Sequence, residues 1–465
     1  MPWHDGAQPV RMQRVAVVAP RVALRSALLR VADAGTVELD APADPSPAPG
    51  SAGQRLARMH AAPVPAALCA LPRDPDVLER QGRADLLTGE AELERHGAAA
   101  VVRDEVAALA GWTPLTEVAP LHGRLAEIGA AIVPLPRPPG SEPPTLLRAS
   151  GARRPFAPLV DTYATVPYAD VDPTLVAGLA YVVMFGAMFA DAGQGAVLAL
   201  AAVALGAGRF RRLAGLRPIW PFLAAAGVAS CVFGVLYGEF FGPTGVLPVR
   251  WIAPLDQPVQ LLAAGVGLGA VLLAGAYALG TVNRWREGGW RLALYASSGL
   301  AGAGLFLALG LAVAGGYWDI GWLLVLGIGV AVTALALTFI GLLTEAGGGA
   351  AGIGQAAIEL FDIVVRLGAN LVSFARLAAF GLTHAALALV VWQATTALWG
   401  AGPVAAVGAV LVFAVGNAVT FALEGLVAGV QALRLEYYEL FSRIFQGEGR
   451  PFDPWHVPVL EEASS

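Results

Sequence analysis

The stretch SFARLAAFGLTHAAL, residues 373–387, carries two ionisable side chains, Arg376 and His384, in a run that is otherwise apolar enough to lie in lipid. A charged side chain at the centre of a bilayer is energetically costly, so such residues face a protein interior or a water-filled path. The stretch therefore predicts a membrane-embedded helix with a functional role, and the rest of the sequence narrows down what that role is.

The composition of the chain is that of a membrane protein. Of its 465 residues, 56% are hydrophobic and 14% are charged, against about 25% charged in an average soluble domain. The net charge of −5 argues against a nucleic-acid partner. The two cysteines, Cys69 and Cys231, match neither a disulfide framework nor a metal motif. The first residues lack the features of a signal peptide, so we expect the N-terminal domain to stay in the cytoplasm.

Residues 1–165 are predicted to form a small cytoplasmic α/β domain. RVAVVAP (14–20), the amphipathic RVALRSALLRVADAG and then TVELD are typical of a strand, a helix and a strand. A second unit of this kind runs from AAAVVRDEVAALAGWTP to LHGRLAEIGAAIVPLP. Between the two βαβ-like pieces, residues 41–53 form a Pro/Ala/Ser/Gly linker with too little apolar content to pack.

Residues 166–465 are predicted to form a transmembrane domain, because they consist of apolar runs of about 20 residues or more. The seven runs are residues 175–207, 219–241, 259–282, 292–314, 320–343, 367–397 and 404–432. The first is overlong, and its centre, FADAGQG (189–195), offers two glycines and Asp191 for a turn. We therefore predict a helical hairpin with arms 174–190 and 194–207, which raises the number of spans to eight.

Arginines predict the orientation of these spans. The arginine-rich loops at residues 209–217 and 284–291 belong in the cytoplasm by the positive-inside rule. Eight spans place both termini on that side as well. We therefore expect a mostly α-helical, multi-pass protein of the cell membrane with cytoplasmic N- and C-termini.

Polar residues form a stripe along each of the last two spans, which are long. At 100° per residue, Asn370, Ser373 and His384 share one side of the first of these helices, with Arg376 at the edge of that sector. The stripe on the last span consists of Asn417, Glu424 and Gln431, with Arg434 one turn further on. We expect the two stripes to face each other.

Each of these residues also has a purely structural interpretation. Arg434, where the apolar run ends, could be a snorkelling cytoplasmic anchor. His384 could be a lone buried histidine bonded to a neighbouring helix, and Arg376 could serve structural pairing. Asp191 could be a loop carboxylate that accepts bonds from its own turn. Glu239, in GVLYGEFFG near the outer end of a span, is either interfacial or part of an outer aqueous entrance.

Motifs spread over nearly the whole chain resemble one known family. They include RMQRVAVVAP, GWTPL, MFGAMFADAGQG, GVLYGEFFG, SFARLAAFGLTHAAL and ALRLEYYELFSRIFQGEGRPFDPW. These are similar to motifs of the large membrane stator subunit of rotary V/A-type ATPases, called subunit a or subunit I. The last three are long and specific, so the family is the principal hypothesis for this chain.

The resemblance implies that the chain is a non-catalytic, ion-translocating subunit of a proton-transporting complex. Arg376 would separate two proton half-channels, because a guanidinium with a pKa above 12 favours the anionic form of each passing rotor carboxylate. The other residues implied in ion translocation are Arg434, Glu424, His384 and Gln431. The further candidates for lining the channel are Ser373, Asn370, Asn417, Glu239 and Asp191.

The resemblance also implies partners, but no cofactor and no metal ion. The implied partners are the c-ring of proteolipid subunits, peripheral stalk subunits, the lipid bilayer and, indirectly, the central stalk and the ATPase head. The chain has no Lys and so no G-x-x-x-x-G-K-[ST] loop, which assigns nucleotide chemistry to partner subunits. Family members usually join two α/β lobes by a long arm. Here that arm is reduced to about residues 41–98, so the stalk attachment or the coupling to the head is expected to differ.

Two other functions are compatible with the same residues. A standalone membrane transporter could bind an anionic substrate with its intramembrane arginines, and it would transport that substrate without a rotor. A scaffold with a degenerate channel would tolerate the loss of Arg376.

Overall fold

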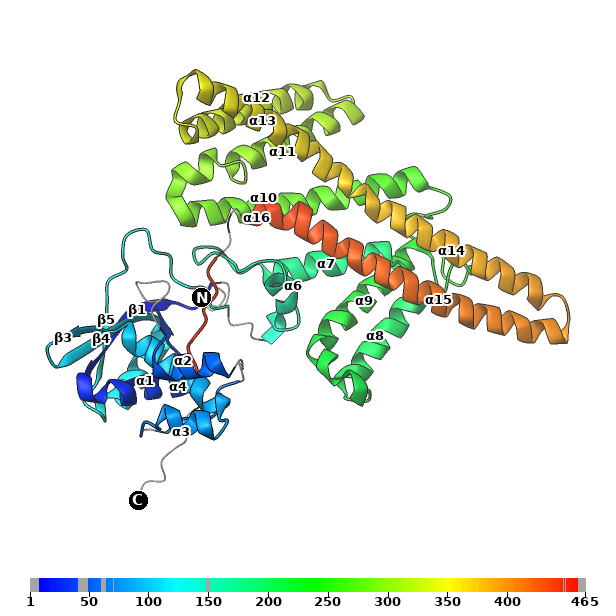
Figure 1. Ribbon diagram of the computed structural model, residues 1–465. Coiled ribbons are helices and arrows are strands. Elements are labelled where there is room, and N and C mark those ends of the chain that lie inside the picture. The colour runs from blue at the N-terminus through cyan, green and yellow to red at the C-terminus, as the bar shows by residue number, and fades with distance from the viewer. Residues whose placement is uncertain are drawn as a thin grey trace. The chain divides into compact units, whose positions relative to one another are not determined.

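The computed structural model describes residues 8–40, 49–59, 64–69, 71–147, 151–445, 447 and 449–458. The contacts divide the chain into two compact units, both drawn in Figure 1. The first covers Pro9–Arg148 and Gly449–Ser465, and the second covers Met1–Gln8 and Ala149–Glu448. As predicted, the chain is mostly helical, with a small sheet near its N-terminus.

One five-stranded sheet forms the centre of the first unit. Its strands are β1 (Met12–Pro20), β2 (Glu38–Leu39), β3 (Val101–Arg103), β4 (Val106–Pro114) and β5 (Ala131–Pro134). The order is β2-β4-β1-β5, with β3 paired to β4, and the pairs are antiparallel. Along the central pair the register runs from Met12 opposite Pro114 to Pro20 opposite Val106.

The two predicted βαβ-like pieces share this sheet and do not form separate lobes. The first piece is β1, α1 (Leu24–Ala34) and β2, and the second is β4, α5 (Val118–Ala126) and β5. In the sheet, β4 of the second piece lies between β2 and β1 of the first, and β1 lies between β4 and β5 of the second. This is the split βαβ arrangement. Both predicted βαβ-like pieces are present, but hydrophobic periodicity identifies their strands and not the pairing order that interleaves them in one sheet.

The segment between the two pieces is helical in the described part. It contains α2 (Ser51–Arg58), α3 (Pro75–Arg80) and α4 (Ala84–Ala98), whose leucines join the core of the first unit. Most of the predicted linker, residues 41–48, lies outside the described residues.

The C-terminal tail also belongs to the first unit. Trp455 and Val457 lie in its hydrophobic core, the Trp455 amide donates to the Val37 carbonyl at 2.9 Å, and the Trp455 indole donates to Glu92 at 3.1 Å. His456 contacts the Ala32 carbonyl at 2.9 Å. The sequence-based division at residue 165 assigns this tail to the membrane domain, whereas its apolar side chains are buried in the α/β unit.

The second unit consists of helices. They are α6 (Ala157–Asp161), α7 (Thr174–Met188), α8 (Ala192–Gly206), α9 (Trp220–Tyr237), α10 (Pro258–Tyr295), α11 (Leu300–Tyr317), α12 (Gly321–Glu345), α13 (Gly349–Ser373), α14 (Ala375–Trp399), α15 (Pro403–Leu435) and α16 (Ser442–Ile444). A 3-10 segment (Arg211–Ile219) precedes α9, and a π-helical segment (Glu436–Phe441) joins α15 to α16. Within the described residues, six helical stretches are long and apolar enough to cross a membrane.

The predicted helical hairpin is present as α7 and α8, with the turn at Phe189–Asp191. Each arm has 15 residues and is therefore about 22 Å long, shorter than the roughly 30 Å of a hydrocarbon core. These two short apolar helices would bring the number of spans to the predicted eight. That number stays a prediction.

A break at Phe374 separates α13 from α14. The Phe374 side chain is fully buried and packs on Gly269 of α10, where a Cβ atom would lie only 2.1 Å from the phenyl Cγ. Arg376 follows two residues later, so this packing fixes where α14 begins and how its first turn is placed.

Candidate functional site

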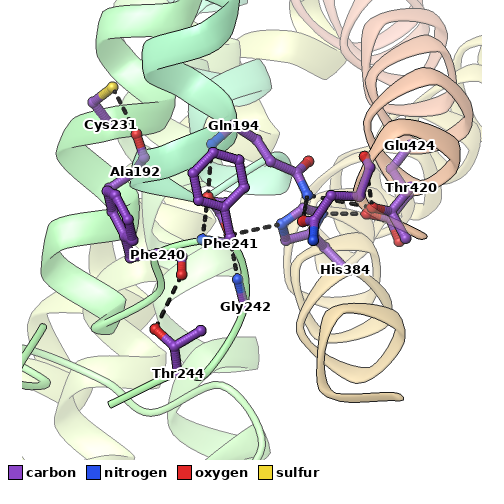
Figure 2. A network of polar contacts seen from close by, with 12 residues as sticks. Ala192, Gln194, Cys231, Phe240, Phe241, Gly242, Thr244, His384, Thr420 and Glu424 are labelled. Atoms are coloured by element: carbon purple, nitrogen blue, oxygen red, sulfur yellow. Dashed lines mark hydrogen bonds and ion pairs between the residues drawn. The ribbon is translucent and has the colours of Figure 1, made fainter. Parts of the chain in front are cut away.

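His384 and Glu424 bring the two long helices α14 and α15 into polar contact. The helices lie side by side (Figure 1), and the imidazole Nδ1 of His384 meets a carboxylate oxygen of Glu424. His384 is only 2% exposed. Figure 2 shows both side chains pointing toward each other across the helix pair. The two polar stripes therefore meet at these residues.

Asp191 holds the turn of the hairpin against the loop that follows α9. Its carboxylate accepts the amide of Gln194 at 2.8 Å, as the N-cap of α8, and the amides of Phe241 and Gly242 at 3.0 and 2.7 Å. The same carboxylate also lies 4.0 Å from the Nε2 atom of His384. Asp191 is thus a turn carboxylate that also faces the histidine.

Glu239 is buried beside these two residues. It is 3% exposed, and its carboxylate, the Asp191 carboxylate and the His384 ring nitrogen lie within 4.8 Å of one another. The backbone carbonyl of Glu239 accepts the amide of Ala192 at 3.0 Å, which ties the loop to the start of α8. We call Asp191, Glu239, His384 and Glu424 the buried acid–histidine cluster.

Gln194 extends this cluster toward α15 but is not among the predicted site residues. Its amide nitrogen donates to Asn417 at 3.1 Å and to Thr420 at 3.3 Å, and the side chain is 1% exposed. Figure 2 shows it reaching from α8 toward Thr420. One feature of the sequence identifies Gln194: it is a polar residue three positions after the capping Asp191 in FADAGQG, where a membrane helix usually has an apolar residue.

Arg376 pairs with Glu439, another residue outside the predicted set. The guanidinium donates to the carboxylate at 2.6 Å, and the two side chains are 27% and 6% exposed. Glu439 lies in the π-helical segment that follows α15, and such segments are frequent at functional sites because they shift side chains relative to a regular helix. No hydrogen bond or ion pair described for these residues joins this pair to the buried acid–histidine cluster.

The remaining predicted residues lie around these two groups. Arg434 is exposed in the last turn of α15, and Gln431, one turn earlier, is half-buried. Asn370 accepts a bond from Arg443 at 2.8 Å in the amide orientation that satisfies both partners. Ser373 is half-buried at the end of α13. The structure thus joins Asn370 to Arg443 of α16 and leaves Arg434 on the protein surface.

Comparison with known proteins supports one family. Residues 101–243 and 355–457, more than half of the chain, match the V-type ATPase 116kDa subunit family. All of the site residues described above fall within these two segments.

Several archaeal proteins are similar to this chain. The "A-type ATP synthase subunit I" of Thermococcus kodakarensis is 26% identical over 373 residues, which cover 75% of this chain and 54% of that protein. The protein of the same name from Aeropyrum pernix is 28% identical over 360 residues, 65% of this chain and 50% of its own length. The chain thus spans about half the length of the curated relatives it matches. Together with its long apolar helices these matches identify a multi-pass membrane protein, and the chain belongs to the V-type ATPase 116kDa subunit family.

Proposed function

We propose that this chain is the membrane stator subunit of a V/A-type rotary ATPase, in which Arg376 stands between two proton half-channels and faces a ring of rotor subunits. The observation that carries this proposal is the ion pair between Arg376 of the apolar helix α14 and Glu439 of the π-helical segment that follows α15. A guanidinium within a membrane span needs a counter-charge, and here that counter-charge comes from the same chain.

The pair suits an exchange of partners. A guanidinium presents several donors in a fixed fork, and Arg376 retains 27% side-chain exposure while one of its nitrogens binds Glu439. A rotor carboxylate that arrives at the exposed side can therefore bind Arg376 as an anion and release its proton. When no rotor carboxylate is present, Glu439 keeps the charge of Arg376 compensated.

The buried acid–histidine cluster would form part of one half-channel. Carboxylate and imidazole groups in series are typical of proton relays in membrane proteins. His384 contacts Glu424 on one side of its ring and faces Asp191 on the other, so it could accept a proton at one nitrogen and pass one on from the other. Gln194 and Asn417 would order water or orient the relay.

The topology is supported by the position of the C-terminal tail. All helices of the second unit lie within Ala149–Glu448, and the segments directly before and after this stretch, Pro9–Arg148 and Gly449–Ser465, belong to the same α/β unit. The chain must therefore leave the membrane on the side where it entered, which requires an even number of crossings. Eight spans with both termini in the cytoplasm meet this requirement, and they also place the arginine-rich loops there.

The proposed partners are the c-ring beside α14 and α15, and peripheral stalk subunits on the α/β unit, which would couple ion flow indirectly to a central stalk and an ATPase head. Because the connecting arm is reduced to about residues 41–98, a stalk would be held nearer the membrane.

ATP-driven proton uptake into inverted vesicles tests the proposal. The comparison is between wild type, Arg376→Ala, and Arg212→Ala, an exposed arginine of the 3-10 segment that serves as the matched control, with each complex assembled to the same level. We expect uptake in the wild type and in the control and none in Arg376→Ala. Equal uptake in all three would refute the role of Arg376. Transport of an anion by the purified subunit alone would instead favour a standalone transporter.

A further inference from the structure

Three Lewis bases converge inside the second unit, one each from His384, Asp191 and Glu239. Their ligand atoms lie within 4.8 Å of one another, and the residues are 2%, 0% and 3% exposed. They come from α14, from the turn before α8 and from the loop after α9. Two carboxylates and an imidazole nitrogen so close together in a buried place require a cation among them, whether a proton or a metal ion.

Two of these atoms have no hydrogen-bond partner among the described residues. They are Nε2 of His384 and Oε2 of Glu239. A buried polar atom without a partner is uncommon and costs free energy, so it calls for an explanation such as a bound ion. Both atoms belong to side chains that are at least 97% buried and whose ligand atoms lie within 4.8 Å of each other.

The contact between His384 and Glu424 prepares the ring for metal binding. When Glu424 is ionised, its contact with Nδ1 favours the neutral tautomer that carries its proton on that nitrogen. The lone pair of Nε2, which lies 4.0 Å from the Asp191 carboxylate, is then available to a metal ion. Metal-binding histidines almost always donate their other ring N–H to a carboxylate or carbonyl, which orients the ring and raises its basicity. Glu424 occupies that supporting position.

The ligand chemistry selects the kind of metal. Ca²⁺ and Mg²⁺ take oxygen ligands, whereas Zn²⁺ takes histidine nitrogen together with carboxylate oxygen. Three protein ligands would leave the fourth position of a tetrahedral ion for water. The charges also match, because a divalent ion balances the carboxylates of Asp191 and Glu239.

The distances in the cluster indicate how the three ligands would have to move to bind Zn²⁺. Zn²⁺ bonds of about 2.0–2.1 Å place tetrahedral ligands about 3.4 Å apart, whereas His384 and Asp191 are 4.0 Å apart. Three backbone amides hold Asp191, and Glu424 holds His384. Glu239 has a longer side chain with one carboxylate oxygen unbound, so its rotation would bring the third ligand into place. The His384 and Asp191 ligand atoms would also have to approach each other by about 0.6 Å.

We propose that Asp191, Glu239 and His384 form a binding site for Zn²⁺ or a similar transition-metal ion, with Glu424 as the supporting carboxylate. This goes beyond the proposed stator function, since binding of the ion requires no rotor. One consequence does rest on that function: a metal ion in the cluster would occupy the proton relay.

The test is Zn²⁺ titration of the full chain, purified in detergent without a histidine tag. Isothermal titration calorimetry measures stoichiometry and affinity, and Co²⁺ absorption reports the coordination. We expect one Zn²⁺ per chain and affinity at least tenfold weaker in Glu239→Gln and in His384→Gln. The matched control, His122→Gln, removes an exposed histidine of α5 and should bind as the wild type does. Equal affinity in all variants, or no stoichiometric binding by the wild type at micromolar Zn²⁺, would overturn the proposal.

X-ray absorption at the zinc edge keeps the test decisive if the variants fold poorly. The wild-type spectrum should show one imidazole and oxygen ligands, and sulfur from Cys69 or Cys231 would refute the site. In the assembled complex, Zn²⁺ should slow ATP-driven proton uptake. Zn²⁺ binding without slower uptake would refute the relay in the proposed function but leave the metal site intact, so the two failures can be told apart.

Discussion

The ion pair between Arg376 and Glu439 gives the sharpest prediction. Removing one partner leaves a buried charge uncompensated, whereas removing both does not, so Arg376→Gln and Glu439→Gln should be strongly non-additive. Two unit charges about 4 Å apart attract by about 4 kcal/mol at an effective dielectric constant of 20. The pair has an N–O distance of 2.6 Å, but Arg376 is 27% exposed, which screens the attraction. We expect a coupling free energy of about 2 kcal/mol, within the usual range for contacting residues.

The assay is a double-mutant cycle on the full chain in mixed micelles, unfolded with SDS and followed by circular dichroism. The control cycle uses Arg83 and Asp85 of the first unit, which pair at 2.8 Å with side chains 45% and 33% exposed. Exposed pairs contribute below about 1 kcal/mol. If the coupling of Arg376 with Glu439 is no larger than that of the control pair, the inference that Glu439 is the resident counter-charge of Arg376 is refuted.

Two further predictions concern the surroundings of the site. Gly269→Ala should destabilise the start of α14, because the added Cβ would meet the Phe374 ring. The control is Gly267→Ala on the same helix, whose added Cβ meets nothing within 4 Å. Hydrogen exchange over residues 374–380 should be faster in Gly269→Ala than in the control, and equal exchange would contradict the prediction. Burial, and then the neighbouring Glu287, raise the pKa of Asp170 from 3.8 to about 8. The folded state therefore favours the protonated carboxyl, whose contribution to stability is fully present below pH about 4 and is lost as the pH rises toward 8. Thermal midpoints from pH 5 to 8.5 should fall more steeply with pH in wild type than in Asp170→Asn, and identical slopes would contradict the pKa shift.

Local signals in the sequence predict local structure well in this chain. The glycines and Asp191 of FADAGQG predict a turn within an overlong apolar run, and the hairpin is there. The spacing of polar residues along the last two spans identifies His384 and Glu424, which the structure brings into contact. Both predictions depend on helix geometry within one segment, where periodicity is informative.

Long-range pairing was harder to predict. Glu439 lies 63 residues after Arg376 and contacts it from a π-helical segment. The direction of a side chain in such a segment cannot be predicted from the 100° per residue of a regular α-helix. Gln194 contacts Asn417 across 223 residues, and no pattern within either segment specifies that meeting. The interleaving of the strands cannot be predicted for the same reason, since alternation identifies a strand but not its neighbour.

The tail carrying Trp455 and Val457 has a consequence for how the protein is made. Most of the α/β unit, Pro9–Arg148, is translated before the membrane helices, yet part of its hydrophobic core is supplied by residues translated after them. At about 5–20 residues per second, the 300 residues of the intervening second unit, Ala149–Glu448, take on the order of 15–60 s to synthesise. During that interval the apolar surface that Trp455 and Val457 will cover stays open, so the α/β unit completes its core only after the membrane helices have been translated.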